Sequence, residues 1–211
     1  MLSKPWLQLY MEFLREYVED KIGSKIEDSE WDREFSFLFT KQTFSKGEDL
    51  LCSGDICDIF YYISSGVVRT YSIDTKGDEQ TWALHINVDS LKVDMFAGDY
   101  HSFFTKNSSD FFAEAFSDVV VYSAKFSDLN TLFEKSLNWM RFGKSIFEEQ
   151  MILFMERKKM MKNLTAKERY LVMKEIAPFY EEILADYQFA TVIGIAPQSL
   201  SRIKGELRKI R

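Results

Sequence analysis

The sequence predicts an α+β fold in three parts: an N-terminal β-roll with flanking helices, one long helix and a C-terminal all-α domain. Short apolar runs separated by glycine-containing turns fill residues 35–124, a pattern typical of a jelly-roll-like double-stranded β-helix. Apolar residues then recur at steps of three and four along residues 137–162. The last segment, 186–211, has the pattern of a helix-turn-helix. We therefore divide the chain into residues 1–136, 137–162 and 163–211.

The composition favours a cytoplasmic protein without a metal or cofactor. The chain has 211 residues and a formal net charge of −6. No apolar run reaches the ~18 residues of a membrane span, and the N-terminus lacks the pattern of a signal peptide, so no membrane contact is expected. A cytoplasmic location favours free thiols at Cys52 and Cys57, which alone are too few to ligate a metal. Nothing in the sequence brings His85 or His101 beside them.

The N-terminal part is expected to begin with a helix and to continue as short strands. Residues Trp6 to Val18 form an amphipathic pattern whose apolar positions are Leu7, Tyr10, Leu14 and Tyr17. A short helical or loop segment is expected at Glu27–Trp31, and a turn at Ser64-Ser65-Gly66. The strand candidates are Thr43–Phe44, Asp49–Cys52, Phe60–Ile63, Val67–Ile73, Glu79–Ile86 and Phe112–Ser123.

A long helix is predicted from Leu137 to Lys162. Its alternating steps of three and four give the series Leu137, Met140, Lys144, Phe147, Met151, Phe154, Lys158 and Met161. A second series at seven-residue spacing comprises Trp139, Ile146, Leu153 and Met160. One broad face buried within a single chain would explain both series. We favour a helix that packs on its own β-roll and on the same helix of a second chain, with a dimer seam of Met140, Phe147, Met151, Phe154 and Met161.

Thr165 and Glu168 predict the start of the next helix. A threonine followed three residues later by a glutamate forms a capping box, in which each side chain bonds the other residue's backbone N–H. The helix is expected to run from Ala166 to about Ile176 and to end at Pro178. Its inward side chains are expected to be Tyr170, Leu171 and Ile176.

The helix-turn-helix prediction depends on a combination of small and apolar residues. Ala190 would allow close approach of the two helices, and Gly194 would adopt the positive φ of the tight turn. Pro197 suits the first turn of the second helix because its missing N–H costs nothing there. Apolar contacts between the helices are expected from Ile195, Leu200 and Ile203. An ordinary helical hairpin is the alternative.

The outward face of the second helix is expected to be polar and to meet the major groove of DNA. Its candidate DNA-binding residues are Gln198, Ser199, Ser201, Arg202, Lys204 and Arg208. We assign base recognition to Gln198, Ser199 and Arg202, and phosphate contacts to Lys204 and Arg208. Charge supports a local footprint, because residues 201–211 contain five basic residues against one acidic residue, a balance of +4.

Several segments resemble the Crp/Fnr family of bacterial transcription regulators. Phe44–Leu51 resembles the strand-turn-strand that opens the family's cyclic-nucleotide-binding-like domain, and Phe60–Arg69 resembles its apolar strand with a glycine turn. Leu164–Tyr170 is similar to the start of the DNA-binding domain. Ile195–Ile203 is similar to the recognition helix and is the most specific match. The resemblance covers nearly the whole chain and implies a homodimer on a palindromic operator, with RNA polymerase as a further candidate partner.

The effector pocket is where the sequence departs from the family. Cyclic-nucleotide binders of the family use a glutamate for the ribose and an arginine for the cyclic phosphate. Here the matching stretch has Asp99, no arginine follows before Ser123, and Lys106 is the only lysine. A buried phosphate without a bidentate partner is costly, so cyclic AMP is not expected to bind. The pocket is either filled or adapted to another, apolar ligand. Its candidate residues are Gly98, Asp99, Tyr100, Phe111 and Phe112.

The family's other sensor chemistries are not expected. An iron–sulfur cluster needs several N-terminal cysteines, and residues 1–51 contain none. Two scattered histidines give little support for haem. The leading hypothesis is therefore a homodimeric DNA-binding transcription regulator with an unidentified effector. The alternative is a sensor or scaffold that binds a protein through its C-terminal helices. No catalytic constellation or phosphate-binding loop supports an enzyme.

Overall fold

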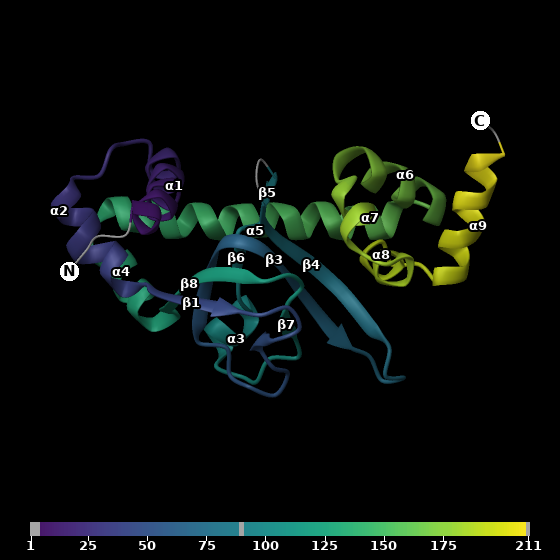
Figure 1. The fold of residues 1–211 in the computed structure, drawn as a ribbon, viewed down its shortest axis with the longest axis horizontal. Helices are drawn as coiled ribbons and strands as arrows, with labels where there is room; N and C mark the ends of the chain where they lie inside the picture. Colours follow the sequence, from purple (N-terminus) through teal and green to yellow (C-terminus); the bar gives the residue numbers. More distant parts are fainter. Residues whose placement is uncertain (1–4, 89–90, 210–211) are drawn as a thin grey trace.

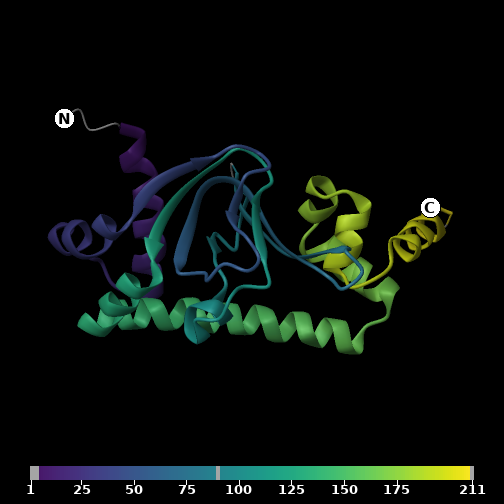
Figure 2. The ribbon, with the colours of Figure 1, turned by 90° about the horizontal axis from the view of Figure 1, so that it is seen from below.

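A curled antiparallel sheet lies along one long helix, with further helices at both ends of that helix (Figures 1 and 2). The computed structural model describes residues 5–88 and 91–209, and its side chains are described for residues 12–88 and 93–209. The predicted apolar side chains Leu7 and Tyr10 and the basic Arg211 lie outside the described side chains. The arrangement confirms the expected α+β fold with a β-roll and a C-terminal group of helices.

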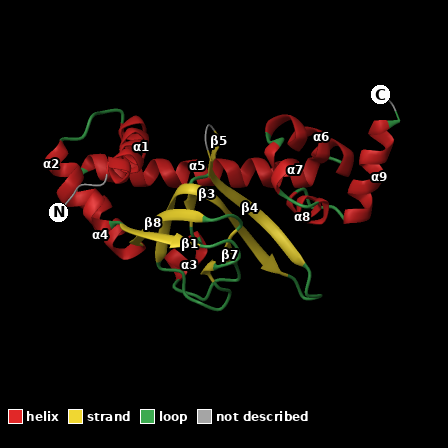
Figure 3. Ribbon diagram, in the orientation of Figure 1, coloured by secondary structure: helices red, strands yellow, loops and turns green. Residues whose placement is uncertain are grey.

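Most helices lie in the two ends of the chain and in the long connection between them, whereas α3 lies among the strands (Figure 3). Their bounds are α1 Pro5–Ile22, α2 Asp28–Glu30, a π-helical turn Trp31–Phe35, a 3-10 turn Ser36–Leu38, α3 Tyr100–Thr105, α4 Phe126–Lys135, α5 Leu137–Asn163, α6 Ala166–Ile176, α7 Phe179–Ile183, α8 Asp186–Val192 and α9 Pro197–Arg208. The strands are β1 Thr40–Phe44, β2 Asp49–Leu51, β3 Ile59–Ile73, β4 Glu79–Val88, β5 Leu91–Val93, β6 Phe96–Ala97, β7 Phe112–Ala115 and β8 Val119–Lys125.

The long strand β3 organises the sheet. The strand order is β1-β8-β3-β4-β5, and β3 also pairs with β6 and β7 at its two ends, while β2 pairs with β7. Because β3 curls through both halves of the sheet, its side chains alternate between the interior of the roll and its outer surface. Ile63 and Val68 are buried inside the roll, whereas Phe60 and Tyr62 face the helices.

Some local predictions were wrong. The predicted turn at Ser64-Ser65-Gly66 is part of β3, where the register with β8 shifts between Ile63 and Ser65. Gly66 has φ +97°, and a Cβ there would lie 2.5 Å from the carbonyl oxygen of Asp118, so the glycine permits an irregularity inside the strand. The predicted strand Phe112–Ser123 is broken into β7 and β8. The elements α3, α4, β5 and β6 were not predicted.

Three groups of buried apolar side chains hold the elements together. One group joins α1, α4 and α5 to the outer face of β3, β6 and β8. A second fills the interior of the roll. The third joins α6, α8 and α9 to Val67, Leu84 and Ile86 on β3 and β4. The C-terminal helices therefore share apolar core with the sheet as well as with one another.

Helix α6 begins as predicted but buries a different face. The Thr165 hydroxyl accepts from the backbone N–H of Glu168, and the Glu168 carboxylate accepts from that of Thr165, which confirms the capping box. Tyr170 and Met173 are buried at a spacing of one helical turn. Leu171 is 43% exposed and Ile176 is 67% exposed, so their predicted inward orientation was wrong. One residue along a helix turns the side chain by about 100°, which carries Leu171 away from the face of Tyr170.

Candidate nucleic-acid interface and effector cavity

Helices α8 and α9 form the predicted helix-turn-helix. Ala190 is fully buried where the helices approach, and Gly194 adopts φ +65° in the turn between them. The Ile195 N–H donates to the Ala190 carbonyl over 3.0 Å, which closes this turn. Pro197 is the first residue of α9, and Leu200 and Ile203 are buried against α8. Each local signal in the sequence therefore has its expected structural role.

The outward face of α9 is polar and accessible. Gln198, Ser201, Arg202 and Arg208 are exposed, and Ser199 is half-buried. Within the described residues, Arg202 has neither an ion pair nor a hydrogen bond. Glu206, one turn further along, instead approaches Lys167 at 4.0 Å. The Arg202 guanidinium is therefore available to a ligand on this face.

Lys204 has a different environment from the other predicted DNA-binding residues. Its ammonium lies 2.6 Å from a carboxylate oxygen of Glu181 and 2.6 Å from one of Asp186. Burial by itself would lower the pKa of Lys204, but the two carboxylates outweigh burial and raise it. The Glu181 carboxylate also accepts from the Tyr170 hydroxyl over 3.0 Å. Lys204 is thus part of an ion-pair group that ties α9 to α7 and α8.

Arg169 supports the turn of the helix-turn-helix from α6. Its Nη1 donates to the carbonyl oxygens of Ile193 at 2.9 Å and Gly194 at 3.1 Å. A Cβ added at Gly194 would lie 3.0 Å from the same nitrogen and 2.9 Å from Met161 Sδ. No sequence pattern singled out Arg169. Its contact with residues more than twenty positions away had no local signal.

Some side chains of the predicted dimer seam are exposed, and others pack within the same chain. Met140, Met151 and Phe154 are exposed, with Met151 60% and Phe154 56% accessible. Phe147 instead packs on Tyr100 and Phe104 of its own chain, with ring centroids 5.7 and 5.2 Å apart.

Other residues of the two helical series are likewise either buried within the chain or exposed. Met161 is half-buried, with its sulfur 3.3 Å from Arg169 Nη1. In the second series Trp139 and Ile146 are buried, while Leu153 is exposed. The part of α5 beyond Gln150 carries the longest run of exposed apolar side chains, Met151–Met155.

A cavity inside the roll lies where the effector pocket was predicted. It is small and partly open to solvent. Its walls are Leu51, Cys57, Tyr61, Thr70, Gly98, Asp99, Phe111 and Ala113. Gly98, Asp99 and Phe111 of the predicted pocket line this cavity. Tyr100 packs on Phe103 and Phe147 instead, and Phe112 stacks on Tyr71 with ring centroids 5.1 Å apart.

The cavity has no positive charge with which to hold a phosphate. No lysine or arginine is among its wall residues. Asp99 begins helix α3, where its carboxylate accepts from the backbone N–H groups of His101 at 2.9 Å and Ser102 at 3.3 Å. This carboxylate therefore caps the helix through Oδ1. The remaining walls are mostly apolar.

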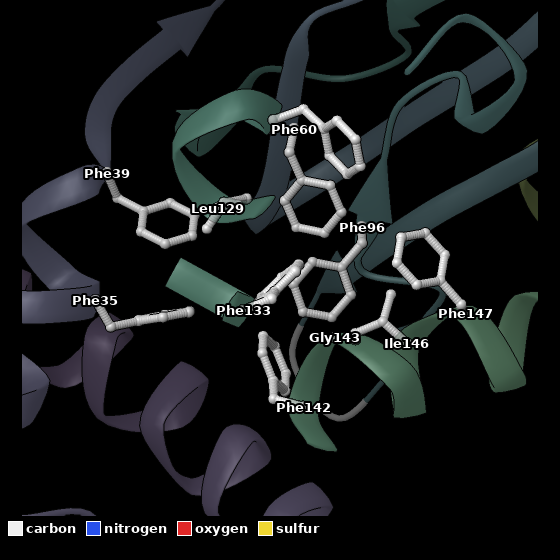
Figure 4. Close-up of a pocket in the computed structure, with 11 residues that line it drawn as sticks. Phe35, Phe39, Phe60, Phe96, Leu129, Phe133, Phe142, Gly143, Ile146 and Phe147 are labelled. Carbon is white, nitrogen blue, oxygen red and sulfur yellow. The ribbon is translucent and has the colours of Figure 1, made fainter. Parts of the chain in front are cut away.

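A second cavity lies outside the roll, between the sheet and α4 and α5 (Figure 4). It is small and partly open to solvent, and its wall is apolar. Its wall residues are Phe35, Phe39, Phe60, Phe96, Phe126, Leu129, Phe133, Phe142, Gly143, Ile146 and Phe147. Gly143 lets the Phe133 ring approach α5, since a Cβ there would lie 2.8 Å from that ring.

A buried polar group connects the cavity inside the roll to α5. His85 Nε2 lies 2.9 Å from Thr70 Oγ1, and Thr70 lines the cavity. His85 Nδ1 lies 2.8 Å from the Asp94 carbonyl oxygen and 3.2 Å from its carboxylate, which accepts from Gln150 on α5 over 2.7 Å. Burial alone would lower the pKa of His85, but the Asp94 carboxylate outweighs it and raises the pKa.

Metal and membrane signals are absent from the described part of the chain. No group of three or more His, Cys, Asp or Glu side chains there is arranged to hold a metal ion. No described helix is both long and apolar enough to cross a membrane.

Known proteins resemble the chain in sequence and in fold. A family model described as a cyclic nucleotide-binding domain matches residues 41–136. The chain is 33% identical over 81 residues to the fumarate and nitrate reduction regulatory protein of Vibrio cholerae, over 38% of this chain and 32% of that relative. It is 24% identical over 195 residues to the Escherichia coli K12 protein of the same name, over 87% of this chain and 75% of that relative.

A solved structure shows the same fold. FixK2 from Bradyrhizobium japonicum aligns with a TM-score of 0.63 and 18% identity, over 81% of this chain and 85% of that chain. The Vibrio cholerae match spans about a third of that relative's length, whereas the Escherichia coli match and the structural match extend over most of both chains.

Proposed function

We propose that this chain is a transcription regulator of the Crp/Fnr family and that it binds DNA sequence-specifically as a homodimer. The observation that carries the proposal is the outward face of α9, where Gln198, Ser201 and Arg202 stand exposed on a helix held by a buried helix-turn-helix core. An exposed helix of this kind fits the major groove. Its relatives are transcription regulators, and we propose no catalytic activity.

Base recognition is assigned to the first two turns of α9. Gln198 and Ser199 lie in the first turn, and Arg202 follows one turn later on the same side. An arginine can donate two hydrogen bonds to guanine O6 and N7, a contact worth about 1–3 kcal/mol of discrimination. Ser201 lies beside this row and is assigned a supporting contact with DNA.

Phosphate contacts are assigned to Arg208 and Lys204, with unequal contributions. Arg208 is exposed in the last turn of α9. Lys204 would have to leave Glu181 and Asp186 before its ammonium could bind a phosphate. We therefore expect Arg208 to contribute more of the salt-dependent affinity than Lys204 does.

Two copies are proposed to associate through the exposed part of α5, with Met151 and Phe154 at the centre of the contact. A two-fold dimer presents two recognition helices and thus fits a palindromic operator. RNA polymerase is a candidate partner of the DNA-bound dimer.

The cavity inside the roll is proposed not to bind cyclic AMP. Its wall lacks a cation, and Asp99 already accepts two backbone hydrogen bonds. A small apolar effector is compatible with the wall, as is a roll that functions without a ligand. In isothermal titration calorimetry we expect no binding of cyclic AMP at sub-millimolar concentration. A micromolar dissociation constant would show that a cation from elsewhere completes the site.

Binding-site selection on the wild type and on Arg202→Ala and Arg208→Ala tests the assignment of α9. We expect the wild type to select a palindrome, Arg202→Ala to lose preference at one base pair in each half-site, and Arg208→Ala to keep the preference. Arg208→Ala should bind operator and random DNA more weakly and reduce the salt slope by about one unit. If the wild type selects no sequence at all, a scaffold that binds proteins through its C-terminal helices becomes the better description.

A further inference from the structure

The helix-turn-helix is docked on an open edge of the β-roll. Residues 79–85 of β4 pair with β3 on one side, whereas β5 covers only residues 86–88 on the other. The Thr81 N–H donates to Thr191 Oγ1 of α8 over 2.9 Å, and the Leu84 N–H donates to the Tyr180 hydroxyl over 3.4 Å. Backbone groups of an edge strand need partners, and here side chains of the C-terminal helices supply them.

An irregularity in β4 presents two more backbone groups at this edge. The register between β3 and β4 shifts, so that Thr81 opposes Tyr71, Ala83 opposes Thr70, and Trp82 between them has no partner in β3. Such a bulge turns backbone groups out of the ladder. The carbonyl oxygens of Thr81 and Trp82 both accept from the guanidinium of Arg157, which is on α5.

Arg157 contacts the helix-turn-helix at the same time. Its Nη2 donates to the Val192 carbonyl at the end of α8 over 3.3 Å and to the Thr81 carbonyl over 3.4 Å. Its guanidinium also lies 5.4 Å from the centre of the Trp82 ring. We call this set the Arg157 bridge: Arg157 with the carbonyls of Thr81, Trp82 and Val192. One side chain thus joins α5, β4 and α8.

The charge of Arg157 is balanced without a carboxylate. Within the described residues it has no acidic partner, and burial lowers its pKa. The carbonyls at a helix C-terminus carry partial negative charge, and an aromatic face attracts a cation. These groups converge only while α8 lies against β4. Moving the helix-turn-helix away would remove the Val192 carbonyl from a half-buried cation, which opposes the movement.

We propose that Arg157 is a positioning residue that fixes the helix-turn-helix against the β-roll. The bridge also borders the cavity inside the roll, because Phe111 of the cavity wall packs edge-on against Trp82 with ring centroids 5.3 Å apart. The relevance to DNA rests on the proposed function. The position of α9 relative to the roll is nevertheless measurable without DNA, so the two ideas can fail separately.

The test measures the distance between paramagnetic labels by double electron–electron resonance. One label is placed at Lys76→Cys in the β3–β4 hairpin and one at Lys209→Cys after α9, in a Cys52→Ser background. Labelled chains are diluted with unlabelled chains so that distances within one chain dominate. The variants are Arg157→Met and Arg157→Lys, and the control is Lys158→Met, which removes the same charge from an exposed neighbour.

We expect one narrow distance distribution in the wild type and in Lys158→Met. Arg157→Met should give a broad distribution or a second one, and Arg157→Lys an intermediate result, because an ammonium cannot reach several carbonyls in a fixed plane. Amide exchange at Thr81 and Leu84 should rise about tenfold or more in Arg157→Met, without a matching rise inside the roll at Val68.

A narrow, unshifted distribution in Arg157→Met would overturn the proposal. So would a rise in exchange that is equal at Thr81 and Val68, because that result indicates a general loss of stability. If Arg157→Met does not fold, the same comparisons apply to Arg157→Lys.

Discussion

The two halves of α5 carry similar apolar patterns but have opposite environments. In the first half Trp139, Phe142 and Ile146 are buried against the chain's own α1, α4 and sheet. In the second half, five consecutive apolar residues, Met151–Met155, are all exposed. Consecutive residues cover every side of a helix, so no single intramolecular face could bury them all. The same spacing therefore serves the chain's own core in one half and leaves apolar side chains exposed in the other, where we propose that a second chain packs.

The largest effect on stability is expected from truncating a side chain in the buried half of α5. The Trp139 ring stacks on Phe35 with ring centroids 5.0 Å apart, and its Nε1 donates to Glu34 over 3.1 Å. Trp139→Ala should lower the free energy of unfolding by about 3–5 kcal/mol, because it leaves a cavity in the core. Urea unfolding of Trp139→Ala and of Phe154→Ala measures the contrast. An equal loss in both at low protein concentration would contradict the division of α5.

The next effect concerns association through the exposed half. Met151→Asp combined with Phe154→Asp should dissociate the dimer, because unpaired carboxylates in an apolar contact cost several kcal/mol. Phe37→Asp, which changes an exposed aromatic outside α5, is the matched control. Sedimentation equilibrium at micromolar concentration should show monomers for the double variant and dimers for the control. A double variant that stays dimeric would place the contact elsewhere.

Loss of the dimer should also affect binding to a full operator and binding to a single half-site differently. If the exposed half joins two copies, the double variant at Met151 and Phe154 should bind DNA with a single half-site with about the same affinity as the wild type. It should lose the added affinity for two half-sites. Fluorescence anisotropy with both DNA lengths measures this. Equal losses on both lengths would indicate damage to the helix-turn-helix itself.

The smallest effect is expected at the boundary between the halves, where Gln150 contacts the buried His85–Asp94 pair. The folded state raises the pKa of His85 above its ordinary value of 6.5. The stabilisation is therefore fully present below about pH 6.5 and is lost as pH rises through the folded pKa, with about 1.4 kcal/mol for each unit of difference. Urea unfolding from pH 6 to 9 should show this decline in the wild type and not in His85→Gln. Parallel curves would mean that His85 is neutral when folded.

The sequence by itself determined the features that depend on neighbouring residues. The capping box of Thr165 and Glu168, the positive φ of Gly194 and the first-turn position of Pro197 were all predictable, because backbone conformation at these points depends on local chemistry. The order of the roll, the long helix and the helix-turn-helix was predictable for a similar reason, since the apolar period changes from strands to helices along the chain.

Tertiary structure alone decided which side chains are free to act. Phe111 reaches the cavity while Phe112 points to Tyr71, because adjacent residues at a strand face opposite sides and only the pairing register fixes which is inside.

The same holds for the charged and apolar residues on the C-terminal helices and α5. The sequence predicted that Lys204 is free to bind DNA, but Glu181 and Asp186 from other helices form ion pairs with it. It also predicted that Phe147 belongs to the dimer seam, but Phe147 packs on α3. No sequence pattern singled out Arg157, because its carbonyl partners on β4 and α8 come together only through folding. Contacts between distant segments depend on packing and register, and spacing along the sequence does not encode them.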